Sequence, residues 1–218
     1  MFMDKNFSAI NLAVLRGDRT IFENLSFNVP SGILLRLIGN NGSGKYTLLK
    51  TLTGLIEPEE GDVKHDAQSI LMDQEWVSEN ICYLGHKNAL KLEFNVYENI
   101  KFWAELWNTT DKIDTSIHAM GIDYLRDTPV RYLSSGQTRR AALARSICHP
   151  AAIWLFDEPT VGLDEKGLSL LASAMEKHLR NGGIILCTTH VDLGLRKELI
   201  STLNLADYSS NLNTEGRV

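Results

Sequence analysis

The sequence predicts an α/β fold built around a central, mostly parallel sheet. Residues 33–38, 151–156 and 183–188 are nearly all apolar, which is typical of strands buried on both faces of a sheet. Helical patterns separate these runs, and buried strands that alternate with helices indicate parallel pairing. Ligands of such sheets bind at the carboxyl ends of the strands, so the residues that follow the three runs are the first candidates for a functional site.

The N-terminal region predicts a second, antiparallel sheet. Residues 7–15 and 24–29 alternate loosely between apolar and polar side chains, as strands with one exposed face do. Residues 58–62 read Pro-Glu-Glu-Gly-Asp, which is typical of a turn. We therefore expect an N-terminal antiparallel β subdomain in front of the parallel sheet.

The parallel sheet begins with the apolar run 33–38. This run leads into a glycine-rich loop and then into a helix over 47–53, which Gly54 ends. A short apolar strand follows at 81–84. A strand, a glycine-rich loop and a helix in this order can hold a phosphate group, as argued below.

Three helices are predicted between the strand 81–84 and the strand 151–156. The second covers 111–120 and the third covers 135–147, so residues 87–149 form a helical subdomain inserted between strands. The first helix carries an apolar stripe at Val96, Ile100, Trp103, Ala104 and Trp107, and the third is expected to be buried along Ala141, Leu143, Ala144 and Ile147.

Residues 1–218 are predicted to form a single domain. Its core comprises 7–86 and 150–205, the helical subdomain covers 87–149, and 206–218 are a polar tail. A last amphipathic helix precedes the run 183–188 and carries Leu168, Leu171, Ala172, Met175 and Leu179.

The glycine-rich loop has the spacing of a phosphate-binding loop. It reads Gly39-Asn40-Asn41-Gly42-Ser43-Gly44-Lys45, between a buried strand and a helix, which is the context that such a loop requires. Its glycines let successive backbone N–H groups converge on a phosphate, and Lys45 supplies a mobile positive charge.

A second loop precedes the third helix of the inserted subdomain. It reads Leu133-Ser134-Ser135-Gly136-Gln137 and offers backbone N–H groups, small hydroxyls and the positive end of a helix to a phosphate. One chain cannot easily wrap both loops around one nucleotide, whereas two copies arranged head to tail can. We therefore expect a homodimer in which each phosphate loop is closed by the other copy's second loop.

Two acids, Asp157 and Glu158, follow the strand 151–156. Such acids can cap a helix or lie at a solvated edge, but here they follow both loops and precede Pro159 and Thr160. In the functional interpretation, Asp157 holds Mg²⁺ through a water molecule and Glu158 polarises an attacking water.

These three motifs resemble those of the ATP-binding-cassette (ABC) transporter ATPases over roughly residues 7–195. The resemblance implies a P-loop NTPase fold of the ABC type, with ATP and Mg²⁺ as its ligands. It also implies that Thr47 turns its hydroxyl toward the α-phosphate and that His190 senses the γ-phosphate. Asp164, in the sequence Gly162-Leu163-Asp164, matches the loop that reaches across the dimer in this family.

The chain departs from the family pattern at three positions. Tyr46 stands where the family has Ser or Thr as a Mg²⁺ ligand, so either water completes the metal shell or the site is reorganised and hydrolysis slows. His86 replaces the family's usual Gln after the strand 81–84. Arg16 aligns with the aromatic residue that stacks on adenine; its guanidinium could stack there, or it could be an ordinary surface arginine.

Shorter strings resemble the cytochrome c maturation ATPases within this family, among them Tyr83-Leu84-Gly85-His86 and Tyr97-Glu98-Asn99-Ile100. The resemblance implies ATP hydrolysis coupled to haem handling or export, and an integral membrane transporter subunit as partner. The chain would then be peripheral, at the cytoplasmic face of the inner membrane or the matrix face of the mitochondrial inner membrane. Alternatives are the ATPase of another small exporter, an ABC ATPase acting on ribosomes or DNA, and a subunit that binds ATP but scarcely hydrolyses it.

Composition limits the possible partners. The net charge of −5, the pI near 5.7 and the lack of a basic stripe argue against nucleic acid. No apolar run approaches the ~20 residues that span a bilayer, so a membrane role depends on a partner subunit. Leu90, Leu92 and Phe94 are apolar in a predicted loop, and either dock that partner or fold back onto Trp103 and Trp107.

Overall fold

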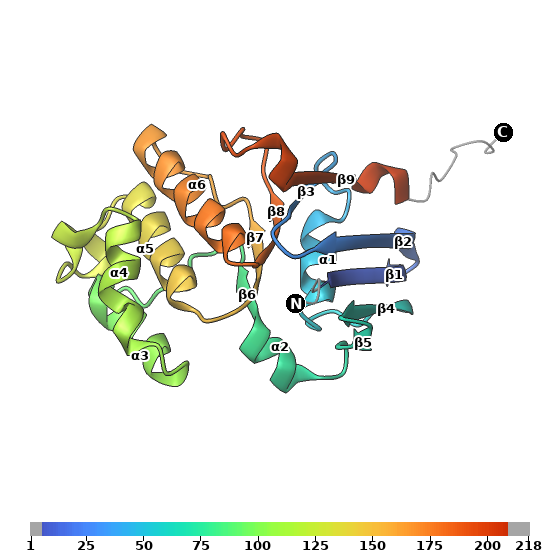
Figure 1. The fold of residues 1–218 in the computed structure, drawn as a ribbon, viewed down its shortest axis with the longest axis horizontal. Helices are drawn as coiled ribbons and strands as arrows, with labels where there is room; N and C mark the ends of the chain where they lie inside the picture. The colour runs from blue at the N-terminus through green and yellow to red at the C-terminus, as the bar shows by residue number, and fades with distance from the viewer. Residues whose placement is uncertain (1–5, 209–218) are drawn as a thin grey trace.

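The computed structural model describes residues 6–208 in three parts (Figure 1). A five-stranded parallel sheet with the order β6-β7-β8-β3-β9 forms the centre. A four-stranded antiparallel sheet with the order β2-β1-β4-β5 lies on one side of it, and the helices α3, α4 and α5 lie on the other. The predicted combination of a parallel sheet, an antiparallel β subdomain and an inserted helical subdomain is therefore present.

The parallel sheet agrees with the apolar runs of the sequence. Side chains along each strand point alternately to the two faces of the sheet. On β7, Trp154 and Phe156 therefore pack in one hydrophobic cluster and Ile153 and Leu155 in another. One strand of this sheet, β9, is an exposed edge with polar residues, and the sequence pattern did not indicate it. The strands are β3 (Leu34–Ile38), β6 (Ile81–Leu84), β7 (Ile153–Asp157), β8 (Ile184–Thr188) and β9 (Ile200–Asn204).

The antiparallel sheet is larger than predicted. Its second strand begins at residue 19 instead of 24, because bulges interrupt its pairing with the first strand and break the alternation on which the prediction rested. The interpretation of 58–62 as a turn was wrong for its second half: Gly61 lies in a strand, where a Cβ would stand 2.5 Å from the carbonyl oxygen of Asn11. The strands are β1 (Asn6–Arg16), β2 (Arg19–Pro30), β4 (Glu60–His65) and β5 (Gln68–Ser69).

The helices of the structure are α1 (Lys45–Leu52), α2 (Gln74–Asn80), α3 (Val96–Leu106), α4 (Ile113–Ala119), α5 (Ser135–Cys148) and α6 (Glu165–Arg180). The sequence pattern missed α2, a short helix in which only Val77 is buried. The helix predicted over 111–120 begins with a 3₁₀ turn at Thr110–Lys112 and becomes α-helical at Ile113.

Two details of the predicted helix faces needed correction. On α3 the buried face consists of Val96, Asn99, Ile100 and Ala104, whereas Trp103 is 36% exposed. On α5 the predicted residues are buried except Ile147, which is partly buried. The predicted tail, 206–218, also begins too early, because Leu205–Tyr208 form a 3₁₀ helix that buries Leu205; residues 209–218 lie outside the described range.

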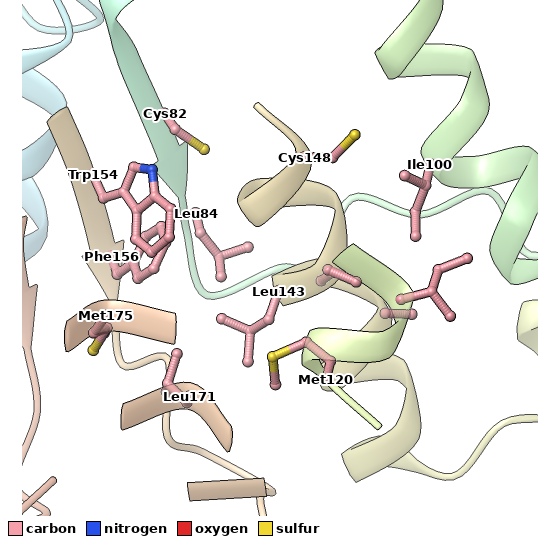
Figure 2. Close-up of a cluster of buried hydrophobic side chains, with 14 of the residues drawn as sticks. Cys82, Leu84, Ile100, Met120, Leu143, Cys148, Trp154, Phe156, Leu171 and Met175 are labelled. Carbon is pink, nitrogen blue, oxygen red and sulfur yellow. The ribbon is translucent and has the colours of Figure 1, made fainter. Parts of the chain in front are cut away.

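The helical subdomain and the parallel sheet share one hydrophobic cluster. Figure 2 shows α5 between the strands β6 and β7 on one side and the helices α3 and α4 on the other, with Leu143 in the middle. Both halves of the molecule therefore pack against the same helix. Within residues 6–208, no helix is both long and apolar enough to cross a membrane.

Two histidines, His178 and His149, are largely buried beside this cluster. The ring of His178 on α6 stacks on Trp154 with centroids 3.9 Å apart, and its Nε2 lies 3.1 Å from the carbonyl oxygen of Ala152. Burial lowers the pKa of His178 from 6.5 to about 4, and burial together with Arg145 does the same for His149. Both rings are therefore neutral in the folded protein at pH 7.

We expect the folded state to lose stability as the pH falls from 7 to 5. The unfolded chain takes up protons near pH 6.5 and the folded chain only near pH 4, so in this interval protonation stabilises the unfolded state relative to the folded one. The loss should be about 2 kcal/mol for each of the two histidines. In urea unfolding, the free energy of unfolding of the His178→Gln variant should depend less on pH than that of the unchanged chain. An identical dependence would contradict the lowered pKa of His178.

Candidate functional site

A cavity of about 540 Å³ lies where the glycine-rich loop meets the end of β7. It joins three segments that are distant in the sequence: the turn of the β1–β2 hairpin, the start of α1 and the two acids after the apolar run. Three cations and two acids contribute to its wall. The lining residues are Arg16, Arg19, Ile21, Asn41, Gly42, Gly44, Lys45, Tyr46, Thr47, Asp157 and Glu158.

The glycine-rich loop has a backbone that other residues could not easily adopt. Gly42 and Gly44 have φ angles of 82° and 96°, and a Cβ on Gly44 would lie 2.6 Å from the Ile21 side chain. Gly44 is also the N-cap of α1, and because glycine has no side chain, the N-cap residue makes no side-chain capping bond. The first N–H groups of α1 are therefore not capped by the N-cap residue and can donate to an anion.

Two polar side chains of the loop fit a phosphate ligand. The Nζ of Lys45 donates to the carbonyl oxygens of Gly39 and Asn40, at 2.7 and 3.0 Å, which holds this cation beside the helix N-terminus. The hydroxyl of Ser43 is buried and has no hydrogen-bond partner within residues 6–208. A buried hydroxyl, a cation and the N-terminus of a helix together supply the donors and the positive charge that a phosphate group needs.

Tyr46 lies beside Lys45, and its side chain is 47% exposed. The Nζ of Lys50, one helical turn later, lies 4.5 Å from the centre of its ring. The ring contributes to the cavity wall, but it places an aromatic surface where Ser or Thr would place a hydroxyl next to the backbone. Residue 46 therefore offers no short-chain oxygen to a metal ion.

The two acids at the end of β7 have different environments. Asp157 is 9% exposed, and its Oδ1 accepts a hydrogen bond from the hydroxyl of Thr188 at 2.9 Å. Glu158 is more open, and its Oε1 lies 3.5 Å from Nε2 of His190. The structure thus brings the predicted pair Glu158 and His190 together at the ends of the neighbouring strands β7 and β8.

Glu158 has an unusual backbone conformation. Its φ angle is +46°, in the left-handed region that non-glycine residues seldom occupy. Its N–H donates to both oxygens of Thr188, the hydroxyl at 2.7 Å and the carbonyl at 3.1 Å. Burial raises the pKa of the Glu158 carboxyl, although nearby His190 opposes this shift. Strained backbone of this kind is frequent at functional sites, where the surroundings hold it in place.

The second loop does not line this cavity. Ser134 is the N-cap of α5: its hydroxyl accepts from the N–H of Gln137 at 3.2 Å, while the Gln137 side chain accepts from the N–H of Ser134 at 2.9 Å. Leu133 packs at the edge of the hydrophobic cluster, whereas Ser134 and Ser135 are exposed. The start of α5 therefore faces outward, away from the chain's own core.

The loop around Gly162 is fixed against the start of α5. A Cβ on Gly136 would lie 2.6 Å from the carbonyl oxygen of Gly162, so these backbones approach as closely as glycine allows. Asp164 caps α6 by accepting from the N–H of Gly167 at 2.9 Å and is paired with Arg140. Both contacts lower the pKa of Asp164.

The other two predicted nucleotide-binding residues, Arg16 and His86, differ in their position relative to the cavity. Arg16 is exposed and also lines the cavity, so both interpretations of it are compatible with its position. His86 is exposed in the loop after β6 and does not line the cavity. Sequence reasoning missed Arg19, which lies opposite Arg16 in the β1–β2 hairpin. It also missed Thr188, whose hydroxyl donates to the Asp157 carboxylate and accepts from the N–H of Glu158. The Arg16-Gly17-Asp18-Arg19 turn was the signal that could have identified Arg19.

The family match and the most similar curated proteins identify the same protein family. Residues 22–161 match the ABC transporter family. A cytochrome c biogenesis ATP-binding export protein CcmA from Vibrio vulnificus is 35% identical over 90% of this chain and 98% of its own length. The CcmA of Agrobacterium fabrum is 41% identical over 87% of this chain and 91% of its own, and that of Rhizobium johnstonii 43% over 85% and 88%.

Solved structures agree on the fold. A putative ABC transporter ATP-binding protein from Pyrococcus furiosus superposes with a TM-score of 0.80 at 23% identity, over 94% of this chain and 100% of its own. The cbiO1 protein from Clostridium perfringens, part of the ABC transporter complex cbiONQ, gives 0.75 at 25% identity over 87% and 80%. Together with the family match and the CcmA relatives, this shows that the chain belongs to the ABC transporter family and is similar to the CcmA proteins along most of its length.

Proposed function

We propose that this chain binds and hydrolyses ATP as the nucleotide-binding subunit of an ABC transporter complex, and that the complex handles or exports haem in c-type cytochrome biogenesis. The observation that carries the first part is the cavity in which the glycine loop, Lys45, Asp157 and Glu158 meet. The haem-related part rests on the similarity to CcmA proteins. A peripheral position at the cytoplasmic face of the inner membrane, or the matrix face of the mitochondrial one, follows from that assignment.

In this proposal the triphosphate lies on the N-terminus of α1. Lys45 leaves the carbonyl oxygens that it now contacts and neutralises phosphate charge, and Thr47 offers its hydroxyl beside it. Arg16 and Arg19 line the cavity on the hairpin side, where a guanidinium can stack on a base. Glu158 orients the attacking water, and His190, whose Nε2 lies 3.5 Å from Oε1 of Glu158, is proposed to respond to the γ-phosphate.

A Mg²⁺ ion, when bound with ATP, would neutralise charge on the β- and γ-phosphates. Asp157 fits this ion, because its carboxylate lies at the cavity wall and is oriented there by the hydroxyl of Thr188. Among residues 6–208 no group of three or more metal-binding side chains exists. Phosphates and water are ligands that Mg²⁺ accepts readily, and they would supply the rest of its shell. Tyr46 does not fit as a ligand.

The second loop supports a homodimer. Ser134 and Ser135 are exposed at the start of a 14-residue helix, and neither lines the chain's own cavity. In the proposed dimer, Ser135, Gly136 and Gln137 of one copy face the γ-phosphate held by Lys45 of the other. The complete site then needs both copies.

The Glu158→Gln variant should form this dimer stably in the presence of ATP and Mg²⁺, because binding survives while water activation is lost. Size-exclusion chromatography with light scattering measures the molar mass and so distinguishes dimer from monomer. Adding Ser135→Glu to the same variant places a negative charge at the helix N-terminus and should return it to monomer. A Glu158→Gln variant that stays monomeric at saturating ATP, even with its membrane partner, would contradict the two-copy site.

The segment before α3 is proposed to dock the integral membrane subunit. Its backbone is fixed, because the side chain of the buried Asn99 donates to the carbonyl oxygens of Lys91 and Phe94 at 3.0 and 3.2 Å. Leu90 and Phe94 are partly buried, whereas Leu92 is 55% exposed. Exposed Phe102 and Leu106 on α3 are further apolar side chains of this subdomain.

We expect Leu92→Glu to abolish association with membranes that contain the partner, at an unchanged midpoint of thermal unfolding. Phe94→Glu should lower that midpoint, because this ring is partly buried and the Nζ of Lys91 lies 4.9 Å from its centre. The matched control is Leu55→Glu, because Leu55 is 63% exposed on another part of the chain. Equal membrane binding by the Leu92 and Leu55 variants would refute docking at this segment.

A second candidate function is a subunit that binds ATP but hydrolyses it slowly, and Tyr46 is the observation that favours it. Binding depends on the loop backbone and Lys45, which Tyr46 leaves in place. Hydrolysis depends more on correct placement of Mg²⁺, where a missing oxygen acts mainly on the transition state.

The Tyr46→Ser variant should therefore raise kcat about ten- to a thousandfold with a far smaller change in the Kd for ATP. Phosphate release and equilibrium nucleotide binding measure the two quantities. Tyr46→Phe, which keeps the ring over which Lys50 lies, should leave kcat unchanged. Equal rates for the unchanged chain and the Tyr46→Ser variant would mean that water already completes the metal shell. A lower rate in that variant would mean that the phenol has a role of its own.

A further inference from the structure

Arg139 is a buried cation at the junction of three parts of the molecule. It lies on α5, one turn after the start of that helix, and is 4% exposed. Its guanidinium reaches the loop after β6 and the segment after β7. A buried guanidinium is costly unless every N–H finds an acceptor, so its partners indicate what it does.

All five N–H donors of Arg139 find acceptors. Nε donates to the carbonyl oxygen of Pro159 at 3.3 Å, and Nη2 donates to those of Asp157 and Glu158 at 3.0 and 2.9 Å. Nη1 donates to the carbonyl oxygen of Gly85 at 3.2 Å and to Oδ1 of Asn88 at 2.9 Å. Lysine has three donors and glutamine two, so no other side chain can make this set of contacts.

The contacts fix the backbone on both sides of Glu158. Thr188 holds the N–H of Glu158, and Arg139 holds the carbonyl oxygens of residues 157, 158 and 159. The left-handed conformation of Glu158, with φ at +46°, is therefore held from both ends. Without the guanidinium, three carbonyl groups would lose a donor and the strained residue could relax.

The same side chain also connects the loop at residues 85–88 to this backbone. That loop leads directly into the segment that carries Leu92. Because one rigid planar group binds both, a displacement of the loop requires either a shift at residues 157–159 or the loss of hydrogen bonds. The guanidinium thus links a surface segment to the carboxylate that faces the cavity.

We propose that Arg139 is a positioning residue: it holds Glu158 in the conformation needed for water activation and couples that conformation to the loop 85–88. This inference rests on the proposed function, since that function gives Glu158 its role in hydrolysis. Burial lowers the pKa of Arg139, but Asp157 and Glu158 oppose this shift, in keeping with a charged guanidinium at this place.

The chain contains a matched control on the same helix. Arg145 is 7% exposed, donates to the carbonyl oxygen of Ala89 and lies over the ring of Trp103, but within residues 6–208 its hydrogen bonds do not reach 157–159. Loss of a buried arginine from α5 should destabilise the fold in both cases. Loss of Arg145 removes a contact to the residue next to the loop 85–88, whereas only the loss of Arg139 removes hydrogen bonds to residues 157–159.

The test compares Arg139→Lys and Arg139→Gln with Arg145→Lys and Arg145→Gln in the full chain. The Arg139 variants should lower kcat by about ten- to a hundredfold, with the Kd for ATP changed less than about twofold, and Lys should retain more activity than Gln. Variants at Arg145 of equal thermal stability should keep kcat. A kcat for folded Arg139→Gln that equals that of the Arg145 variants would overturn the proposal.

Hydrogen exchange provides a readout that does not require turnover. In Arg139→Lys, amide exchange should rise about tenfold or more in the peptides covering 85–89 and 157–161 together, and little elsewhere. A uniform rise over the whole chain, or a rise in one of the two segments alone, would overturn the coupling. If the unchanged protein releases no phosphate, the proposed hydrolysis fails, and the exchange result still decides whether Arg139 holds both segments.

Discussion

The pairing of β7 between β6 and β8 is the constraint on which the functional site depends. β7 is buried along its whole length and is hydrogen-bonded on both edges, with Phe156 opposite Leu84 on one side and Cys187 on the other. Its register places Asp157 opposite Thr188, so the hydroxyl that donates to the Asp157 carboxylate and accepts from the N–H of Glu158 comes from the neighbouring strand. A shift of register by one residue would turn Trp154 and Phe156 to the other face and would also remove this contact.

The sequence predicted those elements whose formation depends on burial. Strands such as Ile81–Leu84 and helices such as α5 have a core face that leaves an apolar pattern. The edge strand β9 and the short helix α2 bury few side chains; main-chain hydrogen bonds hold them, and these leave no pattern in residue type. Gly61 was misread for a related reason: it lies opposite a bulge in β1, and a glycine required by such a close approach looks like a glycine required by a turn.

The candidate site was predictable where its residues are contiguous in the chain. The loop 39–45 and the pair Asp157 and Glu158 could be identified from spacing, because each motif contains its own geometry. Thr188 belongs to the site only through the pairing of β7 with β8, which a single sequence does not specify, whereas Arg19 belongs to it through the local hairpin turn that begins at Arg16. Arg139 left a weak signal: it lies four residues before the buried Leu143, on a helix face where a charged side chain must have found partners.

The helix α5 connects the two halves of the proposed chemistry. Its first turn is exposed and carries Ser134 and Ser135, while one turn later Arg139 points inward and holds the backbone of Glu158. The capping pair of Ser134 and Gln137 stiffens the end of the helix. In the proposed dimer, a phosphate held by the other copy would contact this end of α5, while Arg139 on the same helix holds the backbone of the chain's own Glu158. In that dimer, the same helix would contact one nucleotide and position the residue that acts on the other.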